Sequence, residues 1–459
     1  MNGGGCPEFP CNRFHLGAKA PHAGAGVRLF GAKPSPVARG DTPGAMVQAP
    51  APAPASSHPE RAALIVIAAG VCAALHVGKL APAIAALQAA LGLSLVQAGF
   101  LLSGVQIAGM TLGLAFGVVA DGLGARRSMV LGLSVLALAS AAGALATSVP
   151  WLMALRALEG FGFLMVALPA PGLLRRLVPP GRVSLVLGVW GAYMPFATAL
   201  ALLLGPLWMG WLGWRAWWWL MAVLSALMAW GLVRGVPDGA ATPGPTLAPG
   251  LAWSSRMART LSAPGPWLVA VCFAMYSSQW LAVVGFLPTI YTQAGVPGPL
   301  MGVLTALAAA VNILGNVGSG RLLQRGAAPQ HLLATGFVVM ALAATAAFAG
   351  SPDGGLPAAV RYLAVLLFSG VGGLIPATLF SLAVRLAPSE HTLSTTVGWV
   401  QQWSSLGQFA GPPLVAWVAS LAGGWQHTGL ATGLCSLVGL ALSWGLARQL
   451  SQQAAAATR

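Results

Sequence analysis

Long apolar runs, separated by short gaps that contain most of the arginines, make up the chain from about residue 60 onward. A helix that crosses the hydrocarbon core of a bilayer needs about 20 predominantly apolar residues. The pattern therefore predicts an all-α membrane protein with twelve transmembrane helices, at residues 62–88, 95–120, 128–147, 151–174, 183–204, 214–233, 267–291, 299–320, 331–350, 359–383, 393–419 and 427–447. Ser94-Leu-Val-Gln97 has the pattern of a capping box, which predicts a defined start for the second helix.

The composition agrees with a membrane protein. Of the 459 residues, 57% are hydrophobic and only 7% are charged, whereas soluble domains carry about a quarter charged residues. A net charge of +15 would suggest a nucleic-acid partner in a soluble protein. Here the arginines lie between apolar runs, so we exclude nucleic acid. We expect a lipid bilayer as a partner.

The arginines are distributed unequally between the two sides of the membrane. Loops that carry an excess of Lys and Arg face the cytoplasm. With the N-terminus inside, the outer gaps hold Arg215 and Arg361 alone. The inner gaps and the C-terminal tail hold Arg126, Arg127, Arg175, Arg176, Arg182, Arg234, Arg256, Arg259, Arg321, Arg325, Arg385, Arg448 and Arg459. We therefore expect a multi-pass protein of a bacterial-type inner membrane with both termini cytoplasmic.

Changes in composition suggest the domain boundaries. The first 60 residues are rich in Gly, Pro and Ala and lack the apolar core of a signal peptide, so we expect a disordered tail. Met46 is an alternative start, which leaves open whether residues 1–45 belong to the native protein. A stretch rich in Pro, Gly and Ser divides the spans six and six. The expected parts are a tail at 1–60, a first half at 61–233, a cytoplasmic linker at 234–266, a second half at 267–447 and a tail at 448–459.

Two loops echo each other and suggest a repeat. The second helix ends in GVVADGLGARR (117–127) and the eighth in GNVGSGRLLQR (315–325), each before a cytoplasmic turn. Weak internal similarity across a central loop is typical of transporters built from two repeats.

The first of these loops resembles the signature loop of the major facilitator superfamily. LMALRALEGFG (152–162), with its embedded arginine, and GWR (213–215) are also similar to that family, and residues 78–99 resemble its cyanate/nitroimidazole-type branch. The resemblance covers residues 60–447. It implies twelve helices in two six-helix halves, the major facilitator fold, and a secondary transporter whose halves rock around a site near the membrane midplane.

The signature loop contains the residues of a conformational latch. Gly117 allows close helix packing, and Asp121 lies at a helix C-terminus, where the helix dipole disfavours an anion. Asp121 therefore needs a cationic partner or the N-terminus of a helix, which Arg126 or Arg127 and the neighbouring half can supply. The resemblance implies that these residues, with Gly124, latch the two halves in the outward-open state. The alternative is a loop whose charges only set the topology. In the second half Ser319 takes the place of the aspartate, so we expect a weaker latch there.

Four ionisable residues lie within predicted spans. His76 and Lys79 in the first helix, and Arg156 and Glu159 in the fourth, form two i, i+3 pairs. At about 1.5 Å per residue, all four lie in the outer half of the membrane. Pro82 removes a backbone N–H and should bend the first helix beside Lys79. If Glu159 pairs with Arg156, Lys79 remains for an anion. The alternatives are that Lys79 reaches the outer headgroups, that Arg156 and Glu159 are a structural pair, and that His76 only packs.

The signs of these charges favour an anionic substrate. We assign substrate contact to Lys79, His76 and Arg156, and proton coupling to Glu159 and His76, which are the titratable acid and imidazole of the set. Polar and aromatic residues in other spans complete the expected pocket, or else form hydrogen bonds between helices. These residues are Tyr193, Gln279, Trp280, Asn312, Gln401 and Trp403.

The sequence thus predicts a proton-coupled secondary transporter of a small organic or inorganic anion, a symporter that acts as a monomer. A proton-driven drug or metabolite efflux antiporter is the alternative. The antiporters of the superfamily tend to carry a Gly-Pro motif in the fifth helix, and residues 188–200 contain Pro195 without such a pair. No phosphate-binding loop or HExxH motif is present, and Cys6 and Cys11 have no standard zinc spacing. We therefore expect no enzyme activity, no cofactor and no metal.

Overall fold

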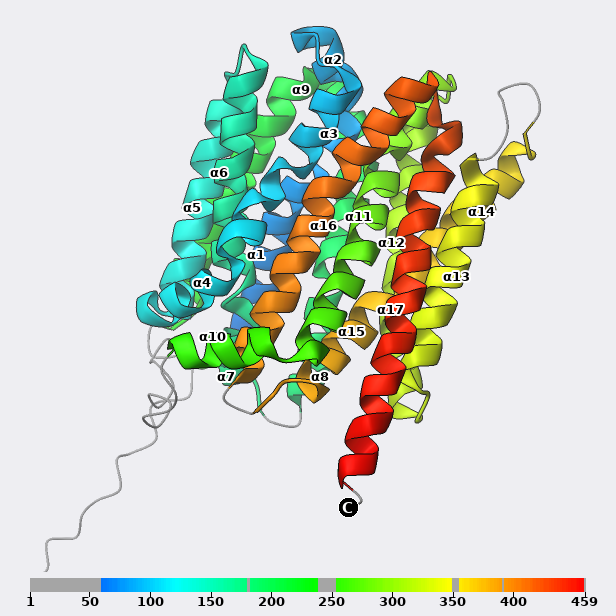
Figure 1. Cartoon of the computed structure of the whole chain (residues 1–459). Helices are drawn as coiled ribbons and strands as arrows, with labels where there is room; N and C mark the ends of the chain where they lie inside the picture. The colour runs from blue at the N-terminus through cyan, green and yellow to red at the C-terminus, as the bar shows by residue number, and fades with distance from the viewer. Residues whose placement is uncertain (1–58, 180–181, 238–252, 349–354, 390–391, 458–459) are drawn as a thin grey trace, which may run out of the picture. The chain divides into compact units, whose positions relative to one another are not determined.

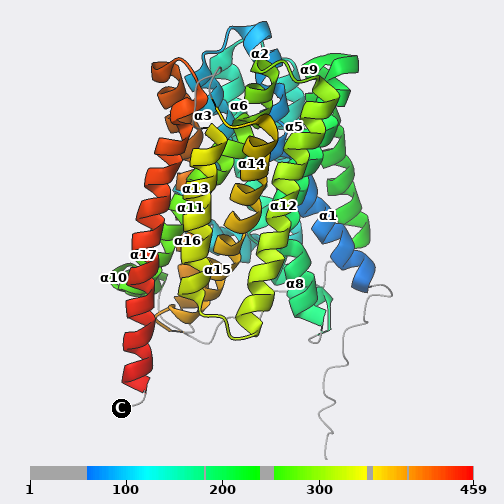
Figure 2. The same cartoon turned by 90° about the vertical axis from the view of Figure 1, so that its right-hand side faces the viewer.

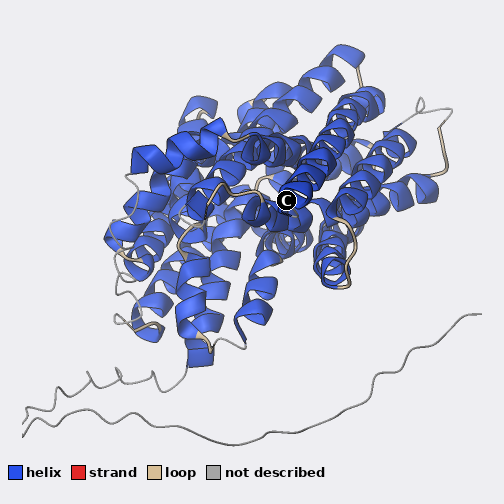
Figure 3. Ribbon diagram, turned by 60° about the horizontal axis from the view of Figure 1, so that its bottom comes forward, coloured by secondary structure: helices blue, strands red, loops and turns tan. Residues whose placement is uncertain are grey.

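A computed structural model describes residues 59–179, 182–237, 253–348, 355–389 and 392–457, which are helical nearly throughout and contain no strand (Figures 1 and 3). The elements of the first half are α1 (Pro59–Gly78), η1 (Ala81–Ala83), α2 (Ile84–Leu91), α3 (Leu95–Ser103), η2 (Gly104–Gln106), α4 (Ile107–Leu123), α5 (Ala125–Ala144), α6 (Val149–Ala167), α7 (Ala170–Leu177), α8 (Val183–Gly191) and α9 (Tyr193–Gly235). The linker forms α10 (Trp253–Ser262). The second half contains α11 (Pro264–Gln293), α12 (Gly298–Gln324), α13 (Pro329–Phe348), α14 (Ala358–Gly372), α15 (Leu374–Arg385), α16 (Leu393–Ala422), η6 (Trp425–His427) and α17 (Thr428–Ala457).

The helices fit the twelve that the hydropathy pattern predicts. Ten helical stretches among the described residues are long and apolar enough to cross a membrane. One of them, α9, is two helices joined at Gly213, whose φ of 76° is left-handed and suits glycine. The 30-residue α16 is not among the ten, but it packs along α11. With α16 included and the two arms of α9 counted separately, the described helices are consistent with the expected twelve spans.

Several of these spans are broken. The first is interrupted between Gly78 and η1, next to Pro82, as the missing proline N–H predicts. Around this break the carbonyl of Lys79 accepts a hydrogen bond of 3.0 Å from the indole of Trp217. The second, fourth and tenth spans are also divided, into α3 and α4, α6 and α7, and α14 and α15. The capping box at Ser94 and Gln97 is present and starts α3.

The arginine-rich ends of the helices lie together. We call this the basic end of the bundle; it includes the end of α4, the helices α7 and α8, and α10, all of which lie low in Figure 1. The first described residues of α1 and the last of α17 also lie toward this end (Figure 2). Helix α10 was not expected, because the linker sequence is rich in helix-breaking residues.

The two halves contact each other mainly through α16, which packs on α3 and α4, and through α9, which packs on α12. Helix α16 packs along both α3 and α4, and Gln106 donates a hydrogen bond of 3.0 Å to Gln408 across this contact. At the end opposite the basic end, η1 and α2 contact α11, and α9 contacts α12. A Cβ at Gly302 of α12 would lie 3.3 Å from the carbonyl oxygen of Leu203. Near the basic end, α7 and α8 make their extensive contacts within the first half, and α15 makes its own within the second.

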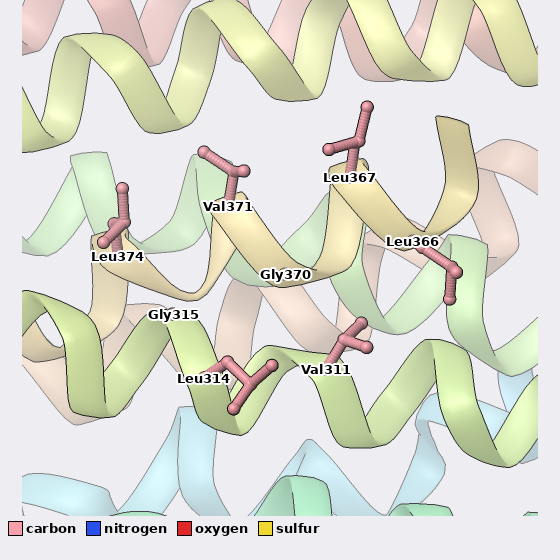
Figure 4. Close-up of a pocket in the computed structure, with 8 residues that line it drawn as sticks. All are labelled: Val311, Leu314, Gly315, Leu366, Leu367, Gly370, Val371 and Leu374. Atoms are coloured by element: carbon pink, nitrogen blue, oxygen red, sulfur yellow. The ribbon is translucent and has the colours of Figure 1, made fainter. Parts of the chain in front are cut away.

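A groove of about 370 Å³ lies between α12 and the α14–α15 segment (Figure 4). Its walls are apolar side chains such as Val311, Leu366 and Val371. The two helices come close at Gly315, where a Cβ would overlap the carbonyl oxygen of Gly370. Leu314 and Leu367 beside the groove are exposed. The groove therefore suits hydrocarbon and offers no polar contacts to a charged solute.

Candidate functional site

The four ionisable residues of the spans meet in one buried cluster. His76 lies in the last turn of α1 and Lys79 follows that helix, while Arg156 and Glu159 lie one turn apart on α6. Each side chain is at most 1% exposed. The backbone N–H of Lys79 still bonds to the carbonyl oxygen of Leu75 at 2.7 Å, so Lys79 extends the last turn of α1, and α1 packs against α6. The structure thus places Lys79 inside the protein, and not at the outer membrane surface.

The carboxylate of Glu159 is shared between two cations. One oxygen accepts a hydrogen bond from the ammonium group of Lys79, and the other accepts one of 2.6 Å from Nη1 of Arg156. The Lys79 ammonium also donates to Ser140 at 2.9 Å and lies 3.4 Å from Nδ1 of His76. Glu159 and Ser140 therefore occupy two of the three ammonium protons, and the imidazole of His76 lies beside the third. This differs from the expectation that Lys79 would remain available when Glu159 pairs with Arg156.

Arg156 has one buried nitrogen without a hydrogen-bond partner among the described residues. Its Nη1 also donates to the carbonyl oxygen of His76 at 2.6 Å, and its Nε donates to that of Leu101 at 3.1 Å. Its Nη2 is buried and has no hydrogen-bond partner among the residues that the structure describes. A buried donor without a partner is costly, so this nitrogen marks a position where an acceptor would be stabilised.

Sequence reasoning missed the neutral residues around the cluster. Ser225 on α9 lies 2.8 Å from Nε2 of His76 and 3.6 Å from Sγ of Cys72. Ser140 on α5 accepts from Lys79 and donates to the carbonyl oxygen of Trp218, whose ring lies 4.8 Å from the ammonium. Isolated serines within apolar runs were the available signal, but many such serines only bond to their own helix.

A second, neutral network lies in the other half. Asn312 of α12 donates hydrogen bonds to the hydroxyl of Tyr276, at 3.0 Å, and to the carbonyl oxygen of Ser369, at 2.8 Å. The indole of Trp280 donates to the Ser369 hydroxyl at 3.0 Å. Asn312 and Trp280, two of the expected substrate contacts, are therefore brought together through α14.

The other expected contacts lie elsewhere. Gln279 accepts a hydrogen bond of 2.7 Å from Ser436 of α17. Tyr193 stacks on Trp190 with ring centroids 4.4 Å apart. Trp403 packs against Trp267 and Trp399 near the start of α16, and Gln401 lies half-buried on the same helix. The structure thus divides the expected pocket residues among several places.

The latch residues are only partly described. Gly117 and Asp121 lie in α4, but their side-chain environment is outside the described part of the chain, so their role remains a prediction. Gly124 has a φ of 80° and separates α4 from α5. Arg126 donates to the carbonyl oxygens of Leu232 and Val233 at the end of α9, and Arg127 is exposed. Within the described residues, no group of three or more His, Cys, Asp or Glu is placed to hold a metal ion.

The charge balance of the cluster yields a stability prediction. Glu159→Gln leaves two buried cations without a counter-charge, and we expect it to lower the free energy of unfolding by about 3–5 kcal/mol. Lys79→Met leaves the Arg156–Glu159 pair balanced and should cost less. The double variant should be more stable than Glu159→Gln alone, because it removes the excess charge. Thermal and denaturant unfolding of the purified protein measures all three.

The matched control for this series is Glu60→Gln. Glu60 pairs with Arg182 at an exposed position, where the side chains are 69% and 60% accessible, so this variant should leave stability unchanged. If Lys79→Met failed to rescue Glu159→Gln, the excess-charge explanation would be wrong.

Comparison with known proteins places the chain in a family. The family model of the Major Facilitator Superfamily matches residues 66–412, and no curated protein sequence matches the chain. Among solved structures, the chain is similar to a bacterial homologue of the human lysosomal transporter Spinster in an inward-facing and unoccupied conformation. The identity is 17% and the TM-score 0.67, over 86% of this chain and 98% of that one. At this identity the likeness shows the fold, and the family model shows the lineage: the chain belongs to the major facilitator superfamily.

Proposed function

We propose that this transporter carries a small organic or inorganic anion across a bacterial-type inner membrane, in symport with protons. The observation that carries the proposal is the buried cluster, in which two cations face one carboxylate and Nη2 of Arg156 has no hydrogen-bond partner in the described part of the chain. Ionisable groups inside a membrane protein are costly and by default belong to a substrate or ion pathway. A carboxylate or inorganic anion beside Arg156 would neutralise the excess charge and accept a hydrogen bond from this nitrogen.

The proposed orientation follows from the arginines. The basic end carries most of those that the structure describes, and Arg215 and Arg361 lie toward the other end. Because Lys- and Arg-rich loops stay inside, the basic end is cytoplasmic on this proposal, and both termini lie there. The narrower resemblance of residues 78–99 to the cyanate/nitroimidazole-type branch stays a proposal of the same kind.

Two groups support proton coupling. His76 and Glu159 are the imidazole and the carboxylate of the cluster, and Nδ1 of His76 lies 3.4 Å from both Oε1 of Glu159 and Nζ of Lys79. A proton on either group would change the attraction that holds Lys79 and Arg156. On this proposal, the protonation of His76 or Glu159 therefore changes the affinity for an anion, and anion binding in turn changes their affinity for protons.

The contacts between the halves support alternating access. At the end opposite the basic end the halves meet through α2, η1 and α11 and through α9 and α12. Toward the basic end α16 also packs on α4, where Gln402 bonds to the backbone of Met110 and Leu114, while α7 and α15 make their extensive contacts within their own halves. The contacts at the end opposite the basic end are expected of a transporter that is closed toward the outside.

An efflux antiporter for cations would need a buried acid available to its substrate, and Glu159 already binds two cations.

The first test measures ligand-induced stabilisation. The purified protein is heated with a panel of inorganic anions, organic acids and lipophilic cations, because a ligand that binds the folded state raises its unfolding temperature. We expect an anion to stabilise the wild type. Arg156→Lys keeps the charge but loses the planar donor set, and should weaken binding by about tenfold or more. Arg182→Lys, at an exposed position, is the control. Uptake into proteoliposomes under a pH gradient then tests coupling.

A different result would favour efflux. If only lipophilic cations stabilised the protein, and Arg156→Lys responded as the wild type does, the anion proposal would fail.

The second test cross-links the end opposite the basic end. Cysteines at Leu203 and Gly302 should react with a short bifunctional maleimide in the resting protein, because α9 and α12 contact there. The cross-link should block turnover but leave anion binding intact. Cysteines at Gly172 of α7 and Val384 of α15, at the basic end, form the control pair and should cross-link poorly. Equal cross-linking of both pairs would contradict the outward-closed arrangement.

A further inference from the structure

Two helices that contact each other, α10 and α16, each carry two buried polar atoms that have no hydrogen-bond partner among the described residues. Two are on α10, Nε of Arg256 and the hydroxyl of Thr260, and two are on α16, the hydroxyl of Thr396 and Nε1 of Trp399. None of the four has a hydrogen-bond partner among the described residues. Thr260 and Thr396 are at most 1% exposed. Buried polar atoms in proteins usually have a hydrogen-bond partner. Four such atoms without one on neighbouring helices therefore suggest that a ligand forms these hydrogen bonds.

The packing of the helices places the two pairs near each other. Arg256 and Thr260 are one turn apart and share a face of α10, which contacts both α11 and α16. A Cβ at Gly407 of α16 would meet Ala274 of α11, and one at Gly411 would meet Ser278. If this parallel pairing continues toward the basic end, Thr396 lies level with residue 263, at the junction between α10 and α11.

Three tryptophans fix this corner of the structure. The ring of Trp267, near the start of α11, packs edge-to-face on Trp399 and Trp403 with centroid distances of 4.8 and 5.5 Å. Its indole N–H donates to the carbonyl oxygen of Leu261, next to Thr260, at 2.8 Å. The aromatic contacts thus hold Trp399 beside the end of α10.

The unsatisfied atoms share one chemistry. The arginine and indole nitrogens can only donate, and the two hydroxyls can donate as well. Arg256 has no ion pair with an acidic residue of the described segments. The hydroxyl of Thr392, at the N-terminus of α16, bonds back to Ser389 and does not cap the described first turn, so the partial positive charge of that terminus remains.

We propose that this corner is a binding site for a phosphate group, held by Arg256, Thr260, Thr396 and Trp399. A phosphate offers several acceptor oxygens and a negative charge to one arginine and three neutral donors. The site is separate from the charged cluster of the first half and does not depend on the proposed substrate. Because α10 lies at the basic end of the bundle, the phosphate belongs either to an anionic lipid headgroup or to a soluble phosphate, and the experiment distinguishes these sources.

The test uses the full-length protein in nanodiscs of phosphatidylcholine. In one arm phosphatidylglycerol is added, and in the other inorganic phosphate is titrated against chloride at equal ionic strength. Unfolding temperature and the number of ligands retained in native mass spectrometry are measured. Stabilisation with one retained ligand in the first arm identifies a lipid headgroup, and in the second arm a soluble phosphate. No effect in either arm overturns the proposal.

Variants on one helix test the position. Arg256→Gln should weaken the binding by about tenfold or more, whereas Arg259→Gln removes the same charge from an exposed position of α10 and should bind as the wild type does. Equal losses in both variants would mean non-specific attraction to a basic helix and would overturn the site.

A variant of nearly the same shape as the wild type tests the site without disturbing the fold. Thr260→Val replaces an unpartnered buried hydroxyl, so without ligand it should be neutral or stabilising. With ligand it should lose part of the phosphate-induced stabilisation. If Thr260→Val kept the full stabilisation by both probes, the hydroxyl would not contact a ligand and the proposed site would be wrong.

Discussion

The shared carboxylate of Glu159 is the interaction on which the first half depends. It joins α1 to α6 through Lys79 and Arg156, and Lys79 extends the connection to α5 through Ser140 and to α9 through the ring of Trp218. Arg156 also binds the backbone beside the breaks in the first two spans, at His76 and Leu101. Four helices are thus held by charges that cannot be left unpaired inside a membrane protein.

The two halves bury different kinds of polar groups inside the membrane protein. The first half buries an ionic cluster on its first and fourth spans, and the second buries neutral amide, phenol, indole and hydroxyl groups on its seventh, eighth and tenth. Neutral networks can be fully satisfied by hydrogen bonds, and the ionic cluster retains an excess cation. On the proposed function, an anionic solute would take its charge contact from the first half, and the second half could supply only neutral donors.

Apolar run length was enough to predict the helices, and the missing N–H of Pro82 was enough to predict the interruption of the first helix near Lys79. The partners of Lys79 were not predictable, because they depend on which way one flexible side chain turns at a helix break. Ser140 and Ser225 were missed for a similar reason, since they come from helices far apart in the chain. Helix α10 was missed because Gly and Pro dominate the composition of the whole linker, while its own ten residues, WSSRMARTLS, contain neither.

The glycines at helix contacts limit how this sequence can change. At Gly160 a methyl group would overlap the backbone of Val105, and at Gly315 it would overlap that of Gly370. In both places backbone meets backbone, so no side-chain rearrangement can make room. Random mutagenesis should therefore return almost no functional clones altered at these two positions, while Gly318 and Gly320, one turn further along α12 and open to their surroundings, should accept many residues. Libraries designed to change transport specificity would do well to leave the first pair untouched.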